Sequence, residues 1–190
     1  MNILTHLATS VGLGASAGIN AYATFLVFGI LARFYPARFT GELADFFSST
    51  PVLCGMAVLY AIEFFADKIP AIDHAWDVIH TFVRPLAGVV ISFAAVDPAL
   101  PKSVGIVAAI LSGGAALGTH LTKSTVRATS TATTGGVANP ILSLIEDLIV
   151  FVQTAIVVVW PYLFLALFVV ILLPTIFVAR SILSRRRAIP

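Results

Sequence analysis

Residues 139–159, NPILSLIEDLIVFVQTAIVVV, indicate the fold class of this chain most clearly. They form an apolar run of the length that an α-helix needs to cross the hydrocarbon core of a bilayer, about 20 residues. Further apolar stretches occupy roughly residues 3–33, 51–67, 85–96, 103–123 and 161–180. The sequence therefore predicts an all-α, polytopic transmembrane helix bundle of about six spans, with room for broken or re-entrant helices.

The composition agrees with a membrane environment. Of the 190 residues, 59% are apolar and 11% are charged, against roughly 25% charged residues in an average soluble domain. We treat residues 1–190 as a single transmembrane domain that ends in a basic cytoplasmic tail, residues 180–190. The net charge of +2 is small and no basic stripe is interleaved with aromatic residues, so we exclude nucleic acid as a partner.

Two places leave the helix boundaries open. The stretch 85–96 is too short to cross a bilayer, so we extend it back through residues 74–83, as a helix that Asp73 caps and that Arg84–Pro85 interrupts. The last two stretches meet at Trp160–Pro161, where the proline either starts a new helix or kinks one long helix. The second alternative would reduce the number of spans to five.

The distribution of Lys and Arg sets the expected orientation, because cytoplasmic loops are rich in both residues. With six spans and the basic run Arg185–Arg187 inside, both termini are cytoplasmic, and we expect the inner membrane of a bacterium. The remaining cations then divide between the two sides, with Lys68, Lys123, Arg127 and Arg180 inside and Arg33, Arg38 and Lys102 outside.

Two glycine-rich segments, Gly12–Gly18 and Gly113–Gly118, each contain two glycines four residues apart. Such pairs let helix backbones approach closely in membranes. They also permit a helix to break near the membrane centre, as in many transporters. Asn20 and His120 follow the two segments. The connector KSTVRATSTATTGGVANP, residues 123–140, is mostly hydroxyls and glycine and fits a re-entrant or polar-lined loop.

Ionisable and polar residues recur at helical spacings in four of the stretches, so each set shares one helix face. A charged group facing lipid costs a few kcal/mol, so we expect these faces to meet one another or a water-filled cavity. Together with Asn20 they form the candidate substrate pathway: Glu63, Asp67, Lys68, Asp73, Asp77, His80, Arg84, His120, Lys123, Arg127, Asn139, Glu146 and Asp147. The alternative is that these groups only form ion pairs near the helix ends, with the long cationic side chains reaching the interface.

Two kinds of chemistry fit the candidate pathway. Arg84, Lys123 and Arg127, helped by helix N-termini, would form an anion site suited to phosphate or carboxylate groups. His80 and His120 could then carry protons, because the histidine charge changes near neutral pH. The sequence therefore favours an anionic substrate, with proton coupling as an added feature.

A divalent metal site is the alternative. Asp73, Asp77, His80 and Glu146 offer carboxylate and imidazole ligands at compatible spacings. The sequence contains no cysteine cluster, no HExxH and none of the usual nucleophile or phosphate-loop motifs. We therefore name no catalytic residue and predict no cofactor beyond that metal. A metal-dependent intramembrane enzyme stays open, although the sequence favours a protein that is not an enzyme.

Four blocks resemble the signature of a known membrane family, the domain of unknown function 4126. They are GINAY at 18–22, EFFADKIPAIDHAWDVIHTFVRPLAG at 63–88, the GG-x5-H-x2-K-x3-R stretch at 113–127 and NPILSLIED at 139–147. The resemblance covers nearly the whole chain in order. It implies a single helical membrane domain and implies no reaction or substrate.

The sequence predicts a small membrane transporter or channel-like translocator with a polar intramembrane cavity and an anionic substrate. The alternatives are a divalent-cation-binding membrane protein and a scaffold without a substrate, which would associate through its glycine segments and apolar tail. The expected partners are the lipid bilayer, the small anion or ion and further copies of the chain. We expect a homo-oligomer because 190 residues make a small bundle for alternating access.

Overall fold

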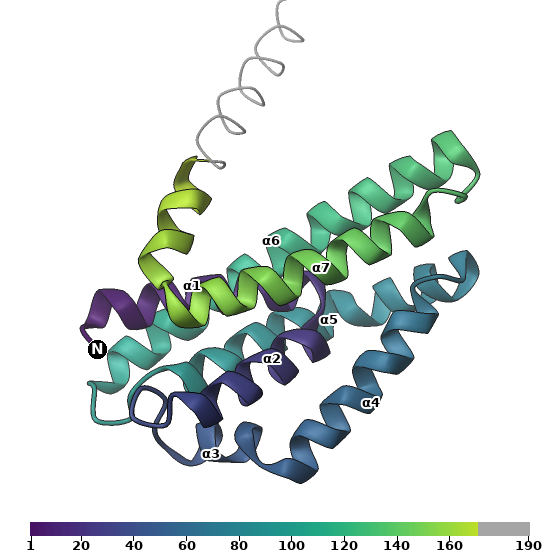
Figure 1. Ribbon diagram of the computed structural model, residues 1–190. Helices are drawn as coiled ribbons and strands as arrows, with labels where there is room; N and C mark the ends of the chain where they lie inside the picture. Colours follow the sequence, from purple (N-terminus) through teal and green to yellow (C-terminus); the bar gives the residue numbers. More distant parts are fainter. Residues whose placement is uncertain (171–190) are drawn as a thin grey trace, which may run out of the picture.

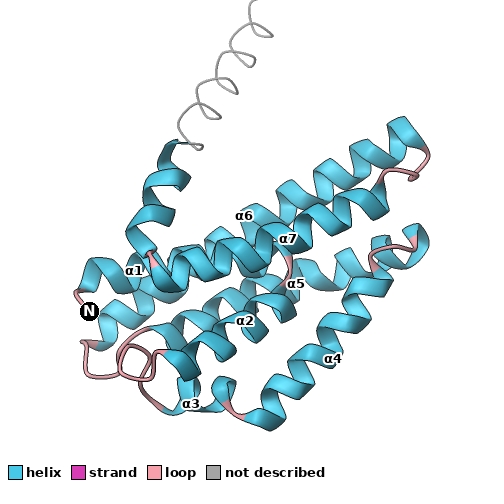
Figure 2. Ribbon diagram, in the orientation of Figure 1, coloured by secondary structure: helices cyan, strands magenta, loops and turns pink. Residues whose placement is uncertain are grey.

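The computed structural model describes residues 1–170, with the backbone alone for residues 70–77. Every regular element in this part of the chain is a helix (Figures 1 and 2), which confirms the all-α prediction. The elements are α1 (Ile3–Ile19), α2 (Ala21–Phe34), α3 (Glu42–Ser48), α4 (Thr50–Ala66), α5 (Pro70–Ala95), α6 (Lys102–Thr134), α7 (Asn139–Val159) and a helix at Pro161–Val170.

Three helices are long and apolar enough to cross a membrane: the Val78–Ala95 part of α5, α6 and α7. The consecutive helices α3 and α4 pass the same test as a pair, bent by 62°, and would make a fourth span. The chain leaves helical geometry at Trp160 before the next helix starts at Pro161. The remainder of that last stretch and the basic tail at 180–190 lie outside the described residues, so the count of about six spans stays a prediction.

The first apolar stretch, predicted to be one span, is broken at Asn20. Asn20 is extended, with φ −149° and ψ 109°, and its Oδ1 accepts a hydrogen bond from the N–H of Ala23 at 2.9 Å. It therefore ends α1 and caps the N-terminus of α2. The two helices have 17 and 14 residues, about 26 and 21 Å, and each falls short of the roughly 30 Å of a bilayer core.

The chain reverses direction between α1 and α2, and we call this unit the α1–α2 hairpin. Figure 1 shows its turn in the middle of the bundle. Both ends of the hairpin lie at one end of the bundle, since Nε of Arg38 donates to Sδ of Met1 at 3.1 Å. We expected the N-terminus and Arg38 on opposite sides. The difference arises because that expectation assumed one unbroken helix.

Glycines allow α1 to lie directly against α6. A Cβ atom on Gly14 would collide with the backbone of Ser112, and one on Gly18 would collide with Ala116 and Thr119. This confirms close packing at the first glycine pair. The second pair, Gly114 and Gly118, differs, because a Cβ at either position would meet no atom within 4 Å in the part of the chain that the structure describes.

The structure corrects the expected boundaries of α5. The helix begins at Pro70 after the N-cap Ile69, so Asp73 lies inside its first turns and is not the cap. It also continues through Pro85 to Ala95, where we expected an interruption. A proline inside a helix removes the hydrogen bond of its own missing N–H, and the packed turns on both sides of Pro85 keep the helix continuous.

The helix α6 runs to Thr134 and takes up most of the connector that we predicted to be a loop. The hydroxyls of Thr125, Thr129 and Thr133 donate to the carbonyl four residues earlier, at 2.7–2.9 Å, so they are satisfied within the helix. The helix ends at Gly135, which adopts the left-handed conformation with φ 63°. The prediction of a re-entrant or polar-lined loop at 123–140 was wrong.

Many large apolar side chains lie on the outside of the bundle, while several polar side chains are buried inside it together with the apolar core. Phe82, Leu86, Ile110 and Leu148 are between 64% and 74% exposed, whereas Ser112 and Thr154 are fully buried. Contiguous apolar surface of this extent is unusual on a monomer in water. The arrangement suits a bilayer as solvent, so the structure supports a membrane protein.

Candidate functional site

Ionisable side chains from four parts of the fold meet inside the bundle, beside the tip of the α1–α2 hairpin. We call this group the charge cluster, and it consists of Glu63, Asp67, Lys68, His80, Arg84, His120, Lys123, Arg127, Glu146 and Asp147. Asn20 contacts it from the hairpin. The side chains of Asp73 and Asp77 lie outside the described residues. Asn139 is separate, because its amide donates to Thr131 at the α6–α7 turn at 2.9 Å.

One half of the charge cluster is organised by Arg84, which α5 places at the centre of the bundle. Its Nη2 donates to Oε1 of Glu63 at 2.8 Å, and its Nη1 donates to Nδ1 of His120 at 2.7 Å. The same Nη1 also donates to the carbonyl of Gly18 at 3.2 Å. This guanidinium therefore joins α4, α6 and the end of α1.

The other half pairs two cations of α6 with two carboxylates. Asp67 Oδ2 lies 3.1 Å from Nζ of Lys123 and 3.0 Å from Nη2 of Arg127. Glu146 accepts from both Nε and Nη2 of Arg127 and lies 3.4 Å from Lys123 Nζ. Burial alone would raise the pKa of Asp67, which lies just past α4, but the two cations hold that pKa below its usual value.

The broken end of α1 supplies backbone acceptors to the charge cluster. The last carbonyls of a helix have no partner within the helix and carry partial negative charge. The Gly18 carbonyl accepts from Arg84, and the Ile19 carbonyl accepts from Nζ of Lys123 at 3.1 Å. Both cations therefore bind a helix C-terminus in the interior of the bundle.

Asn20 connects the hairpin tip to α7. While its Oδ1 caps α2, its Nδ2 donates to Oδ1 of Asp147 at 3.3 Å. Asn20 was predicted from the sequence, but the Gly18 and Ile19 carbonyls were not, because any residue can supply a backbone carbonyl. The available signal was an asparagine directly before the apolar run AYATFLVFGIL, which is a helix-start pattern inside a stretch too long for one span.

Asp147 differs from the other carboxylates of the cluster. It is 7% exposed and makes no ion pair within the described residues. The nearby cation, Lys68, instead donates to the carbonyl of Phe64 at 2.8 Å and to Oγ of Ser143 at 3.5 Å. Partial burial lowers the pKa of Lys68, which lies in the turn after α4.

Hydrogen bonding fixes the state of one cluster histidine. Because Arg84 has only protons to donate, Nδ1 of His120 must be the acceptor. The ring proton then lies on Nε2, 3.1 Å from Oγ1 of Thr81, and His120 is neutral in this arrangement. His80 is buried, with Nε2 3.9 Å from Glu63 Oε1 and its ring against the edge of Tyr22.

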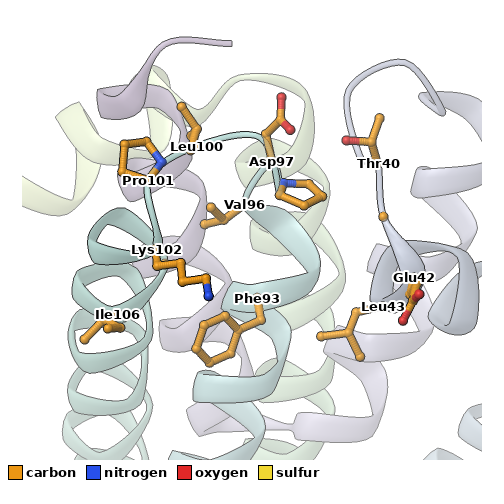
Figure 3. Close-up of a pocket in the computed structure, with 13 residues that line it drawn as sticks. Thr40, Glu42, Leu43, Phe93, Val96, Asp97, Leu100, Pro101, Lys102 and Ile106 are labelled. Carbon is orange, nitrogen blue, oxygen red and sulfur yellow. The ribbon is translucent and has the colours of Figure 1, made fainter.

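The charge cluster is closed and balanced in this structure. Its described members comprise four carboxylates and four cations, and only Lys68 and Glu146 are partly exposed. Two clefts in the described part of the chain lie away from it. The larger, of about 620 Å³, is at the opposite end of the bundle (Figure 3), and the smaller lies around Trp160.

The metal alternative finds little support among the residues whose side chains are described. No three His, Cys, Asp or Glu side chains in that part of the chain lie close enough to hold a metal ion. Glu146 is occupied by Arg127 and Lys123, which is an unsuitable setting for a metal ligand. Two of the predicted ligands, Asp73 and Asp77, fall outside that part.

No curated protein and no solved structure matches the chain. A family model described as Domain of unknown function (DUF4126) matches residues 7–181, which is nearly the full length. This agrees with the resemblance of the four sequence blocks, and the chain belongs to the DUF4126 family.

Proposed function

We propose that the protein is a small membrane translocator, with the charge cluster as its transport site and the α1–α2 hairpin as a re-entrant hairpin. The observation that carries the proposal is the helix break at Asn20, which brings the Gly18 and Ile19 carbonyls to Arg84 and Lys123 inside the bundle. Non-helical backbone at membrane depth is tolerated where it is buried in protein or lines a polar pathway, and many transporters use it to form their binding sites.

The energetic cost of the charge cluster favours a functional role over a scaffold. Buried ion pairs are often no more stabilising than well-packed apolar residues of the same volume. Ionisable residues inside membrane segments usually mark substrate or ion pathways. A bundle that served only for association would gain nothing from eight charged residues at the junction of its helices.

The clamp around Glu146 supports an anionic substrate. Its carboxylate is held by the fork of Arg127 and by Lys123, yet it is the most exposed acidic side chain of the two ion-paired halves, at 17%. An Arg guanidinium that donates two hydrogen bonds in this way binds planar oxyanions such as carboxylates specifically. We take Glu146 as an internal stand-in for a substrate carboxylate. When it moves away, Arg127 and Lys123 face Asp67 alone, which leaves one positive charge for an incoming anion.

Uptake into proteoliposomes tests the proposal. We expect radiolabelled succinate to be taken up, with inorganic phosphate as a second probe and both measured with and without an imposed pH gradient. The charge-neutral double variant Arg127→Gln/Glu146→Gln should remove uptake and keep the fold. The control is Arg33→Gln, which removes an exposed cation in the last turn of α2, away from the charge cluster.

Two outcomes would contradict the proposal. The first is equal uptake by the wild type and by the Arg127→Gln/Glu146→Gln double variant. The second is no uptake of either anion by the folded wild type under both conditions, which would favour the scaffold alternative.

A further inference from the structure

The cleft at the end of the bundle opposite the charge cluster has walls from two parts of the chain. One wall is the end of α5, the turn at 96–101 and the start of α6, and the other is the segment that leads into α3. The two walls approach each other closely at Gly41. This residue has φ 101°, which favours glycine, and a Cβ atom there would lie only 2.8 Å from Cγ of Pro98 in the other wall. Figure 3 shows the resulting space between Lys102 and Phe93 on one side and Leu43 on the other.

The lining of the cleft combines an apolar interior with charges of both signs. Phe93, Leu43 and Ile106 are apolar and exposed. Lys102 has an exposed ammonium group with no ion pair or hydrogen bond to the described part of the chain. Glu42 and Asp97 also belong to the lining, and Oδ1 of Asp97 accepts a hydrogen bond from the N–H of Ala99 at 2.9 Å, which leaves its second oxygen for a ligand.

These charges complement a zwitterion better than a simple anion. One cation suits a single phosphate group, whereas two carboxylates would repel a ligand of net negative charge. The two carboxylates instead suit a cationic group beside the phosphate. A primary ammonium fits better than a quaternary one, because it can donate hydrogen bonds to carboxylate oxygens.

We propose that this cleft binds an aminophospholipid of the phosphatidylethanolamine type from the surrounding bilayer. Lys102 receives the phosphate, Glu42 and Asp97 receive the ammonium, and the first part of the acyl chains packs on Phe93 and Leu43. The position supports a lipid as the source, since the cleft lies where α5 ends and α6 begins, the level at which a spanning helix meets the headgroups. A volume of about 620 Å³ accommodates a headgroup with the start of its chains.

Native mass spectrometry tests the inference on the full-length protein, independently of transport. The protein is released from nanodiscs that contain equal amounts of phosphatidylethanolamine, phosphatidylcholine and phosphatidylglycerol. We expect phosphatidylethanolamine to be retained preferentially. Lys102→Gln should lower its retention about fivefold, which is the upper range for loss of one exposed ion pair. The double variant Glu42→Gln/Asp97→Asn should remove the preference over phosphatidylcholine.

Two further variants give the inference a control and a steric test. Arg38→Gln removes a cation at the same end of the bundle but outside this cleft, and it should retain the lipid as the wild type does. Gly105→Leu places a side chain beside Phe93 and should reduce retention of every lipid, because it fills the cleft.

Three results would overturn the inference. They are equal or stronger retention of phosphatidylglycerol, unchanged retention in both Lys102→Gln and Gly105→Leu, and equally tight binding of soluble phosphoethanolamine. The last result would show that the acyl chains contribute nothing. The transport proposal would be unaffected by any of them, because it concerns the other end of the bundle.

Discussion

Nη2 of Arg84 lies 2.8 Å from Oε1 of Glu63, and both side chains are completely buried. Removing one partner of such a pair leaves an uncompensated buried charge, which costs about 3–5 kcal/mol. We therefore expect Arg84→Gln to destabilise the protein by about that amount. The double variant Glu63→Gln/Arg84→Gln should be far closer to the wild type, because it removes both charges. Thermal and denaturant unfolding in detergent measure the difference.

Arg33→Gln is the control for this pair, because the Arg33 side chain is exposed and its loss should cost no more than about 1 kcal/mol. If the single and double variants at the buried pair lost equal stability, the two side chains would not be coupled as the structure shows.

The two aspartates of the charge cluster should respond differently to neutralisation. Asp67→Asn leaves Lys123 and Arg127 with one carboxylate between them, so we expect a loss of about 3 kcal/mol or more. Asp147→Asn removes a buried charge that has no ion pair in the described part of the chain, and an amide can keep the contact with Asn20. We expect its stability to change by less than about 1 kcal/mol. Equal losses in the two variants, compared by unfolding, would contradict this assignment.

The two glycine pairs provide a matched test of helix packing. Gly14→Ala and Gly18→Ala force α1 away from α6, and overpacking of this kind typically costs about 1–3 kcal/mol. The new methyl groups of Gly114→Ala and Gly118→Ala would contact no atom of the described structure. Because alanine has a higher helix propensity than glycine, each substitution should stabilise the protein by up to about 1 kcal/mol. Unfolding midpoints of the four single variants are the measurement. Destabilisation by the second pair would instead indicate a contact with another molecule.

The direction of the α1–α2 hairpin can be tested by labelling in membrane vesicles. In a chain with Cys54→Ser, an N-terminal epitope and Ala37→Cys should be accessible from the same side, because Arg38 contacts Met1. Val137→Cys in the α6–α7 turn should be accessible only from the other side. An N-terminal epitope on the side of Val137 would show that the first stretch crosses the membrane once.

The fold class and most members of the charge cluster could be predicted from the sequence, for different reasons. Apolar runs reveal helices because a bilayer excludes unsatisfied backbone groups, and helical spacing correctly placed His120, Lys123 and Arg127 on one buried face. Spacing says nothing about partners on other helices. The pairing of Arg84 with Glu63 therefore needed the structure.

Two errors came from judging segments by composition alone. The first apolar stretch contains no charged residue near its break, and Asn20 indicates a cap only when its neighbours are considered as a helix start. The region after residue 123 has many threonines, which are usually assigned to loops. Their hydroxyls bond within the helix, so α6 continues to Thr134.

The hairpin tip also has a consequence for biogenesis. Its contacts reach forward in the chain by 66 residues to Arg84, by 104 to Lys123 and by 127 to Asp147. A ribosome delivers α1 and α2 before any of these partners exists, and contacts of such long range form slowly. The hairpin therefore leaves the ribosome well before its native neighbours, and its contact with Asp147 cannot form until α7 has emerged.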